Sequence, residues 1–438
     1  MTVRNPLKKD SRKNSRKNSR TAWLAWLAAA VFYFYEYFVR VAPCVMESDL
    51  RDAFDASASA IGFASGLYYM VYGPLQIAVG PIYDRFGYRR PFYVASLLVL
   101  IGCFFCALPG GVGTFAVGRV LMGAGSAFAF IGTMYVASIW FSRSRWAFLS
   151  GLTTALGMGG AILGQVPVAW LLRRFGWRGS WLVAGAIGVA VAMLLRFWLP
   201  PEPEGPSPSP ADPSSGRRSR HFFSSLGSVL RNPQTWLAGC VACALFLPLT
   251  VFADFWGVHY IELLTGATAV QAATANGMLY LGWLLGSPLV GSLSDFVGRR
   301  KPFLVGSCLV GLLLLLLILG PSHLSLPLLG FFLFLLGLFS SPQVICFTIS
   351  GEHNAREVQG TAIAVVNTAV MLIGGVMQPV VGFLLDYHAG ACEGMNSSYT
   401  LSHFRSAFLI LPVAMALGLL LSLAMRESGE AGQRRHLA

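Results

Sequence analysis

The chain has 438 residues, of which 55% are hydrophobic and 12% are charged, and its mean hydropathy is +0.62. Charged residues make up about a quarter of an average soluble protein, so this composition excludes a soluble globular protein. Apolar segments of about 20 residues, long enough to cross the hydrocarbon core of a bilayer, recur along the whole sequence. The sequence therefore predicts an all-α integral membrane protein.

The first 21 residues are predicted to form a disordered, basic, cytoplasmic tail. Eight of the 32 Lys and Arg residues lie within the first twenty positions, inside the repeat SRKN-SRKN-SR. Such a segment is too polar to fold alone, and it favours the cytoplasmic side of a membrane. Contact with anionic lipid headgroups is the alternative interpretation. The net charge of +13 is therefore attributed to membrane topology, and no nucleic-acid partner is expected.

Twelve apolar spans follow in chain order. They extend over residues 22–47, 56–83, 91–109, 112–140, 145–171, 178–199, 233–262, 271–294, 302–320, 324–350, 357–386 and 402–425. A stretch rich in proline, serine and charge separates the sixth span from the seventh, as expected for a flexible cytoplasmic linker. The predicted units are thus two six-helix bundles at 22–199 and 233–425, a linker at 200–232 and a cytoplasmic tail at 426–438.

The basic residues between spans predict that both termini are cytoplasmic. In that orientation most of the basic clusters lie on the inner side: Arg85, Arg89, Arg90, Arg143, Arg145, Arg217, Arg218, Arg220, Arg299, Arg300, Lys301, Arg434 and Arg435. An acidic loop from Glu47 to Asp55 lies outside, and the cluster of Arg173, Arg174 and Arg178 departs from the rule. We expect a monomer in the inner (plasma) membrane, surrounded by lipid.

One loop sequence occurs twice. GPIYDRFGYRRPF at 80–92 matches GSLSDFVGRRKPF at 291–303 without a gap, 211 residues further on. A parallel repeat of two six-helix bundles is a known transporter architecture, with the substrate bound near the bilayer midplane between the halves. Both segments resemble the G-x-x-x-D-R-x-G-R-R/K signature between helices 2 and 3 of the major facilitator superfamily. The resemblance implies the major facilitator fold, with twelve transmembrane helices in two pseudo-symmetric bundles.

The repeated loop is predicted to act in gating. Asp84 stands at the C-terminal end of a helix, where the helix dipole disfavours an acid, so it needs cationic or N–H partners. Gly87 permits the tight turn, and Gly80 permits close approach of another helix. The resemblance implies a latch that closes the cytoplasmic side; a purely topogenic role is the alternative. The gating residues are Gly80, Asp84, Arg85, Gly87, Arg89, Arg90, Gly291, Asp295, Gly298, Arg299 and Arg300.

The first span carries two charges inside YFYEYFVRVAP, residues 33–43. A charge at the bilayer centre costs about 2.5–3.5 kcal/mol on insertion scales, so it should face protein or a water-filled cavity. Glu36 and Arg40 are spaced i,i+4 and can pair, and Tyr33 and Tyr37 fall on the same face. We predict that Arg40 binds a carboxylate through its planar fork and that Glu36 carries a proton. An ion pair that only fixes helix packing is the alternative.

The spacing Tyr37-x-x-Arg40 resembles the N-Y-x-x-R element in helix 1 of the anion:cation symporters, whose arginine contacts an organic anion. Glu36 stands in place of the asparagine, and Val39 precedes the arginine in place of an aspartate. The segment YEYFVRVAPCVM is also similar to sequences of the intraphagosomal amino-acid transporter branch of the superfamily.

Further buried charges are expected at Arg119 and Asp254. Arg119 lies in GRVLMGAGSAFAF, which resembles the superfamily's helix-4 motif, whose arginine is linked to proton coupling. We assign it to substrate binding, with hydrogen bonds to helix carbonyls as the alternative. Asp254, in VFADFWGVHY, corresponds through the repeat to Pro43, one turn beyond Arg40, and is predicted to couple protons near the cavity mouth. His259 is predicted to be an interfacial residue.

Polar side chains on other spans complete the predicted site. Tyr33 and Tyr37 of the first span are predicted to bind substrate. The substrate-binding candidates on the other spans are Tyr68, Tyr72, Gln76, Asn276, Tyr280, Gln343 and Asn367, with Thr154, Gln165 and Gln378 as further cavity residues. Bridging between helices is the alternative role for each of them.

The predicted function is secondary active, proton-coupled import of a small carboxylate-bearing solute, an organic anion or an amino acid, by alternating access. Deprotonated Glu36 would occupy Arg40, and protonation would release Arg40 to the substrate. Sodium is the alternative coupling ion. No cofactor, metal site or enzymatic activity is expected: the sequence has no G-x-x-x-x-G-K-[ST] loop, and both CxxC pairs lie in apolar helices.

Proton-driven efflux of amphipathic drugs or metabolites is the alternative function. Antiporters of the superfamily often carry G-x-x-x-G-P-x-x-G-G on helix 5. GLTTALGMGGAILGQVP at 151–167 has the glycines, but its proline, Pro167, comes late. A membrane sensor is a third possibility, and it would need a soluble domain for signalling.

Overall fold

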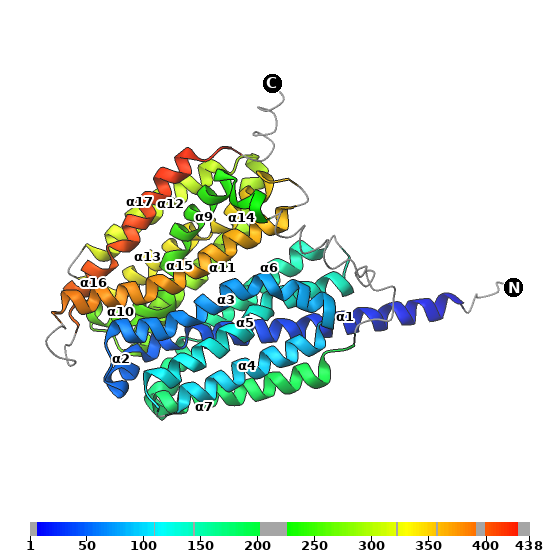
Figure 1. Ribbon diagram of the computed structural model, residues 1–438, viewed down its shortest axis with the longest axis horizontal. Helices are drawn as coiled ribbons and strands as arrows, with labels where there is room; N and C mark the ends of the chain where they lie inside the picture. Colours follow the sequence, from blue (N-terminus) through cyan, green and yellow to red (C-terminus); the bar gives the residue numbers. More distant parts are fainter. Residues whose placement is uncertain are drawn as a thin grey trace, which may run out of the picture.

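The computed structural model describes the backbone of residues 7–108, 110–142, 145–201, 226–320, 323–355, 358–390 and 399–427, and all their side chains except those of 7–19, 147 and 295. Helices joined by short turns make up these parts of the chain, and no strand occurs among them. They form two halves that lie side by side (Figure 1). The predicted all-α architecture of two bundles is confirmed.

The N-terminal half consists of α1 (Leu7–Val41), α2 (Pro43–Phe54), α3 (Ala58–Phe86), α4 (Arg89–Ala107), α5 (Val112–Trp140), α6 (Trp146–Leu163) and α7 (Val166–Trp198). The C-terminal half consists of α9 (Pro233–Leu247), the π-helix η2 (Pro248–Trp256), α10 (Gly257–Thr265), α11 (Ala269–Val297), α12 (Lys301–Leu319), α13 (Leu326–Ser340), α14 (Gln343–Glu352), α15 (Gln359–His388), α16 (Leu401–Phe408) and α17 (Ile410–Ala424).

The helices account for twelve membrane crossings. In the described part of the chain, nine segments are long and apolar enough to span a bilayer. One of them, Phe148–Trp198, has 51 residues, more than twice the roughly 20 that a crossing needs. Gly176 interrupts it with φ 69°, so this segment crosses twice. The 29-residue helices α3 and α11 supply the remaining two crossings.

The first helix departs from the predicted span of 22–47. Its backbone is helical from Leu7, inside the segment predicted to be disordered, and α1 ends at Val41. Pro43 has no N–H to continue the helical ladder, and α2 begins there. The acidic segment from Glu47 to Phe54 is therefore a helix and not the predicted loop. Most of the linker (202–225) and the C-terminal tail from residue 428 lie outside the described residues.

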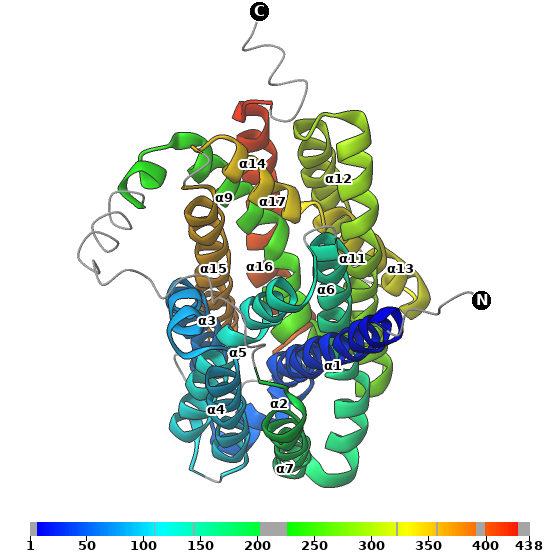
Figure 2. The ribbon, with the colours of Figure 1, turned by 90° about the vertical axis from the view of Figure 1, so that its right-hand side faces the viewer.

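The two halves touch closely along α3 and α15, which lie side by side in Figure 2. A Cβ atom on Gly62 would stand 2.8 Å from the carbonyl oxygen of Gln378, and one on Gly66 would overlap the carbonyl oxygen of Gly375. A Cβ on Gly80, near the other end of α3, would meet nothing within 4 Å. The helices therefore diverge along their length, and Gly80 does not make the close approach predicted for it in this conformation.

The two halves thus touch at one end of the molecule, called closed, and lie further apart at the other, called open. The closed end, called the Glu47 end below, carries α2 and α10, at the left of Figure 1. The open end, called the arginine-rich end below, carries Asp84, Arg89 and Arg300. The halves diverge toward it in Figure 1.

Replacing Gly66 with alanine is expected to destabilise this conformation, because the new methyl group would overlap the backbone of α15. Overpacking of this kind typically costs about 1–3 kcal/mol. The measurement is the midpoint of thermal unfolding in detergent, with Gly80→Ala as the matched control on the same helix. Equal midpoints for the two variants would contradict the close contact at Gly66.

Candidate functional site

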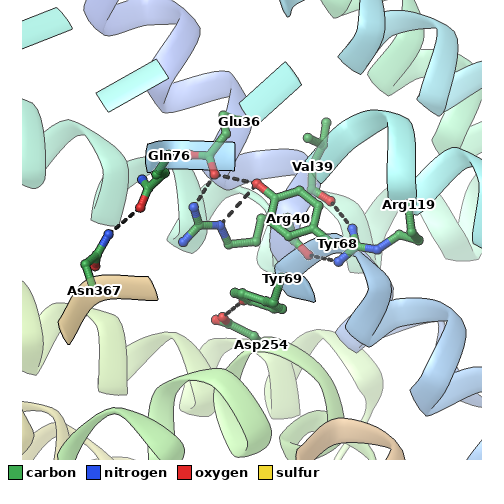
Figure 3. Close-up of polar contacts among 9 residues, drawn as sticks. All are labelled: Glu36, Val39, Arg40, Tyr68, Tyr69, Gln76, Arg119, Asp254 and Asn367. Atoms are coloured by element: carbon green, nitrogen blue, oxygen red, sulfur yellow. Dashed lines mark hydrogen bonds and ion pairs between the residues drawn. The ribbon is translucent and has the colours of Figure 1, made fainter. Parts of the chain in front are cut away.

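A cluster of charged residues and tyrosines lies between the two halves (Figure 3). Glu36, Arg40 and Arg119 come from the N-terminal half and Asp254 from the C-terminal half, and each is at most 3% exposed. Charged groups this deeply buried are stable only when ion pairs or hydrogen bonds compensate them. Their partners therefore show what each of them does in this conformation.

Arg40 and Glu36 form an ion pair along α1. The hydroxyl of Tyr68 donates a hydrogen bond to Glu36 and lies 3.4 Å from Nε of Arg40. The second carboxylate oxygen of Glu36 has no hydrogen-bond partner among the described residues. Rings surround the guanidinium: its carbon lies 4.0 Å from the ring centroid of Tyr37 and 5.0 Å from that of Tyr72. Arg40 is thus an aromatic-lined cation whose only acidic partner in the described structure is Glu36.

Tyr33 and Tyr37 lie together on the same face of α1, as their spacing predicts. Their ring centroids are 5.1 Å apart in an edge-to-face arrangement. On the other side of these rings, α6 approaches closely: a Cβ on Gly157 would stand 2.7 Å from the ring of Tyr33. Glycine at this position of α6 therefore leaves room for the tyrosine face of α1.

Arg119, on α5, holds the C-terminal end of α1. Its guanidinium donates to the carbonyl oxygens of Val39 (3.3 Å), Arg40 (3.2 Å) and Ser65 (3.4 Å). The carbonyl of Val39 lacks its helical partner because Pro43 has no N–H. The contacts of Arg119 are therefore those of the alternative interpretation, in which it forms hydrogen bonds to helix carbonyls. These hydrogen bonds hold the end of α1 that carries Arg40 against α5.

Asp254 lies on η2 and accepts hydrogen bonds from the hydroxyls of Tyr69 and Tyr280. The Tyr69 ring also lies 5.7 Å from the Arg40 guanidinium, so this tyrosine connects the charged groups of the two halves (Figure 3). Asp254 therefore lies inside the cluster and not at the predicted cavity mouth. Sequence reasoning missed Tyr69, although the run LYYMVY contains it between two tyrosines that were selected.

The π-helix explains how Asp254 reaches the cluster. Each π-turn shifts the hydrogen-bond register, and such turns are frequent at functional sites. The carbonyl of Ala253 accepts hydrogen bonds from the side-chain amides of Gln165 and Asn276, both at 2.8 Å. The amide of Gln378 donates to the carbonyl of Thr250, also at 2.8 Å. Side chains from both halves thus support the irregular segment.

Polar bridges between the halves lie on both sides of the cluster. Gln76 and Asn367 are hydrogen-bonded toward the arginine-rich end (Figure 3). At the other end, Nδ1 of His259 lies 2.6 Å from the carboxylate of Glu47. Glu47 is 1% exposed, although its segment was predicted to be an outer loop. His259 was predicted to be an interfacial residue and Glu47 to lie in an outer loop, and the contact between them was missed.

Two predicted cavity residues form no hydrogen bond with the described residues of the cluster. One of them, Gln343, is buried at the start of α14. The other is Thr154, whose hydroxyl donates to the backbone carbonyl of Ser150 in its own helix, at 3.0 Å. Among the described residues, no group of three His, Cys, Asp or Glu side chains could hold a metal ion.

The repeated loops form the turns that their glycines predict. Gly87 and Gly298 both have φ 67°, in the region that favours glycine. Arg89 donates to the carbonyl of Arg196 at 3.4 Å, and Arg300 pairs with Glu352 at 2.7 Å, each within its own half. Asp84 is exposed, and no ion pair or hydrogen bond joins it to the described residues, including Arg85, Arg89 and Arg90. The latch predicted for this loop is not engaged in this conformation; the Asp295 side chain is outside the described set.

Comparison with known proteins identifies the family. The family model of the Major Facilitator Superfamily matches residues 25–379 and 258–436. A probable sulfoacetate transporter, SauU of Cupriavidus necator, is 26% identical over 380 residues, covering 81% of this chain and 85% of that protein. The membrane sensor protein UhpC of Salmonella typhimurium is 26% identical over 317 residues, covering 63% of this chain and 64% of that protein.

The fold agrees with that result. A crystal structure of a bacterial homologue of the human lysosomal transporter Spinster, in an inward-facing and unoccupied conformation, superposes with a TM-score of 0.76 at 15% identity. The superposition covers 92% of this chain and 97% of the homologue's chain. With the family model matching most of the sequence, the chain belongs to the major facilitator superfamily, a family of membrane transporters and not of enzymes.

Proposed function

We propose that this protein is a secondary active transporter that carries a small carboxylate-bearing solute, an organic anion or an amino acid, together with a proton. One observation carries the proposal: Arg40 is fully buried between the two halves, and Glu36 is its acidic partner. Arginine binds carboxylates through two parallel hydrogen bonds, so a solute carboxylate can take the place that Glu36 occupies.

The exchange of partners requires a proton. If Glu36 left Arg40 as a carboxylate, a buried negative charge would remain without compensation, which is costly in a low dielectric. Protonation of Glu36 removes that charge and frees the guanidinium at the same time. Binding of the solute and binding of the proton therefore favour each other, as coupled transport requires.

Asp254 is the group through which the second half takes part. It reaches the cluster through Tyr69, which lies beside Arg40, and through Tyr280. Separation of the halves would break the contact between Tyr69 and Asp254 and leave a buried carboxylate short of a partner. We infer that Asp254 takes up a proton at that step.

One relative and the resemblance of the first span support an anionic solute. Sulfoacetate, named for SauU, carries a carboxylate and a sulfonate. The spacing of Tyr37 and Arg40, which resembles that in the anion:cation symporters, also favours an organic anion. The resemblance to the intraphagosomal amino-acid transporters favours an amino acid. With both termini cytoplasmic, the open arginine-rich end would face the cytoplasm, and import is the direction we propose.

The test is ligand-induced thermal stabilisation of the purified protein by a panel of amino acids, carboxylates, sulfonates, sugars and lipophilic cations. The panel is run in acidic and in neutral buffer, with and without sodium. Stabilisation by a carboxylate, stronger in acidic buffer and indifferent to sodium, is expected. A requirement for sodium would replace the proton as coupling ion.

Two other outcomes would overturn the proposal. Stabilisation by lipophilic cations alone would support efflux of amphipathic compounds. A carboxylate that stabilises the protein but is not taken up by proteoliposomes would support a sensor, the role that the name of UhpC gives to that relative.

A further inference from the structure

The motif G-x-x-x-D of the repeated loops occurs a third time, at the end of α15. Gly382 and Asp386 stand in GFLLDYHAG with the spacing of Gly80 and Asp84. Asp84 is two residues from the end of α3 at Phe86, and Asp386 is two residues from the end of α15 at His388. The two helices pack against each other from opposite halves, so the motifs mark opposite ends of one helix pair.

Asp386 caps the first turn of α3 across the interface. Its carboxylate oxygens accept hydrogen bonds from the backbone N–H groups of Ala58 (3.0 Å) and Ser59 (2.9 Å). The first N–H groups of a helix have no partners within the helix, and the helix dipole favours a negative charge there. Ser57 of the same half supplies a second cap, since its hydroxyl oxygen accepts from the N–H of Ala60 at 3.3 Å. Asp386 thus stabilises a helix end of the opposite half.

Tyr399 strengthens this contact. Its hydroxyl donates to Asp386 and accepts from the N–H of Ala58 at 3.2 Å. Burial, together with the hydrogen bond to Asp386, raises the pKa of Tyr399 to about 12, so the hydroxyl keeps its proton at neutral pH. The guanidinium of Arg51 lies 4.3 Å from the Tyr399 ring centroid, which adds a cation–π contact between the halves.

The glycines show that the two motifs are in opposite states. A Cβ on Gly382 would overlap the carbonyl of Ala58, so α3 and α15 touch at the Glu47 end. A Cβ on Gly80 would meet nothing within 4 Å, and Asp84 is exposed. In this conformation the G-x-x-x-D motif of α15 is engaged and that of α3 is not.

We propose that Asp386 is a latch that holds the Glu47 end closed and must release before that end can open. It acts on α3 as the loop at Asp84 is predicted to act at the arginine-rich end. Because α3 and α15 each carry one latch, closing one end and opening the other becomes a single exchange of helix caps. The proposal concerns the conformational cycle and holds whichever solute is carried.

Hydrogen–deuterium exchange of the ligand-free protein in nanodiscs tests the latch without any transport assay. Asp386→Asn is expected to speed exchange of the Ala58 and Ser59 amides by about tenfold or more, because a charge-assisted acceptor is lost. It should also slow exchange in the first turn of α15 and around residues 80–87, because the population shifts toward closure of the arginine-rich end. The matched control is Ser57→Ala, which removes the cap contributed by the same half and should act only near Ala60.

Faster exchange at Ala58 and Ser59 with no change at the arginine-rich end would overturn the latch and leave Asp386 as a local cap. Tyr399→Phe keeps the carboxylate and removes only the hydroxyl, so it serves as a second variant if Asp386→Asn does not fold. It should give the same pattern with smaller changes, and absence of the distant effect would again contradict the proposal. Both readouts are obtained without solute, so failure of carboxylate transport would not affect them.

Discussion

Replacing Arg40 with lysine is expected to lower the affinity for a carboxylate solute by about ten- to a hundredfold while the protein stays folded. Lysine keeps the positive charge beside Glu36, but its ammonium group cannot make two parallel hydrogen bonds to one carboxylate. Loss of one charge-assisted hydrogen bond costs about 1.5–3 kcal/mol, which corresponds to that range of affinity. The measurement is binding of the stabilising carboxylate by calorimetry, together with uptake into proteoliposomes.

Arg119→Lys is the matched control, since it makes the same chemical change in the same cluster. Arg119 donates to three backbone carbonyls, so Arg119→Lys should lower the thermal midpoint more than Arg40→Lys does. It should lower the affinity for the carboxylate less than Arg40→Lys does. If Arg40→Lys binds the carboxylate as well as the wild type, Arg40 is a packing residue and the proposed site is wrong.

The features that could be predicted from sequence are those that depend on local geometry. The i,i+4 spacing of Glu36 and Arg40 places both side chains on one face of a helix, and the structure shows them paired. The positive φ of Gly87 and Gly298 follows equally from the tight turn between two helices. The two-bundle architecture could be predicted because the repeated loop fixes the correspondence between the halves.

The features that were missed depend on contacts between distant segments. Tyr69 meets Asp254 and Glu47 meets His259 only because the halves close on each other, and periodicity within one helix carries no information on that contact. The register shift of η2 also escaped prediction: VFADFW is as apolar as an ordinary helix, and side-chain amides from other helices support the shift.

Which end of the molecule is closed could not be predicted either. The sequence contains G-x-x-x-D motifs at both ends, and a transporter that works by alternating access must open each end in turn. Only the distances show that Gly382 is in contact and Gly80 is open. One sequence is compatible with both conformations, and their free energies differ by little. Sequence patterns do not predict which of the two is more stable.

Replacing Glu36 with glutamine should separate binding from proton coupling. Glutamine can still accept the hydrogen bond from Tyr68, but it is neutral at every pH and leaves Arg40 available to the solute. In the wild type, binding should strengthen as the pH falls, because protonation of Glu36 releases Arg40. In Glu36→Gln, carboxylate binding should be as strong in neutral buffer as in acidic buffer.

Proteoliposomes loaded with the solute give the decisive comparison. The variant should exchange labelled for unlabelled solute at a rate near that of the wild type, because the loaded carrier can still alternate. It should accumulate less solute than the wild type when a pH difference is imposed, because the proton that Glu36 carries no longer accompanies the solute. Accumulation equal to that of the wild type would remove Glu36 from coupling and leave Asp254, the other buried carboxylate of the cluster, as the group that carries the proton.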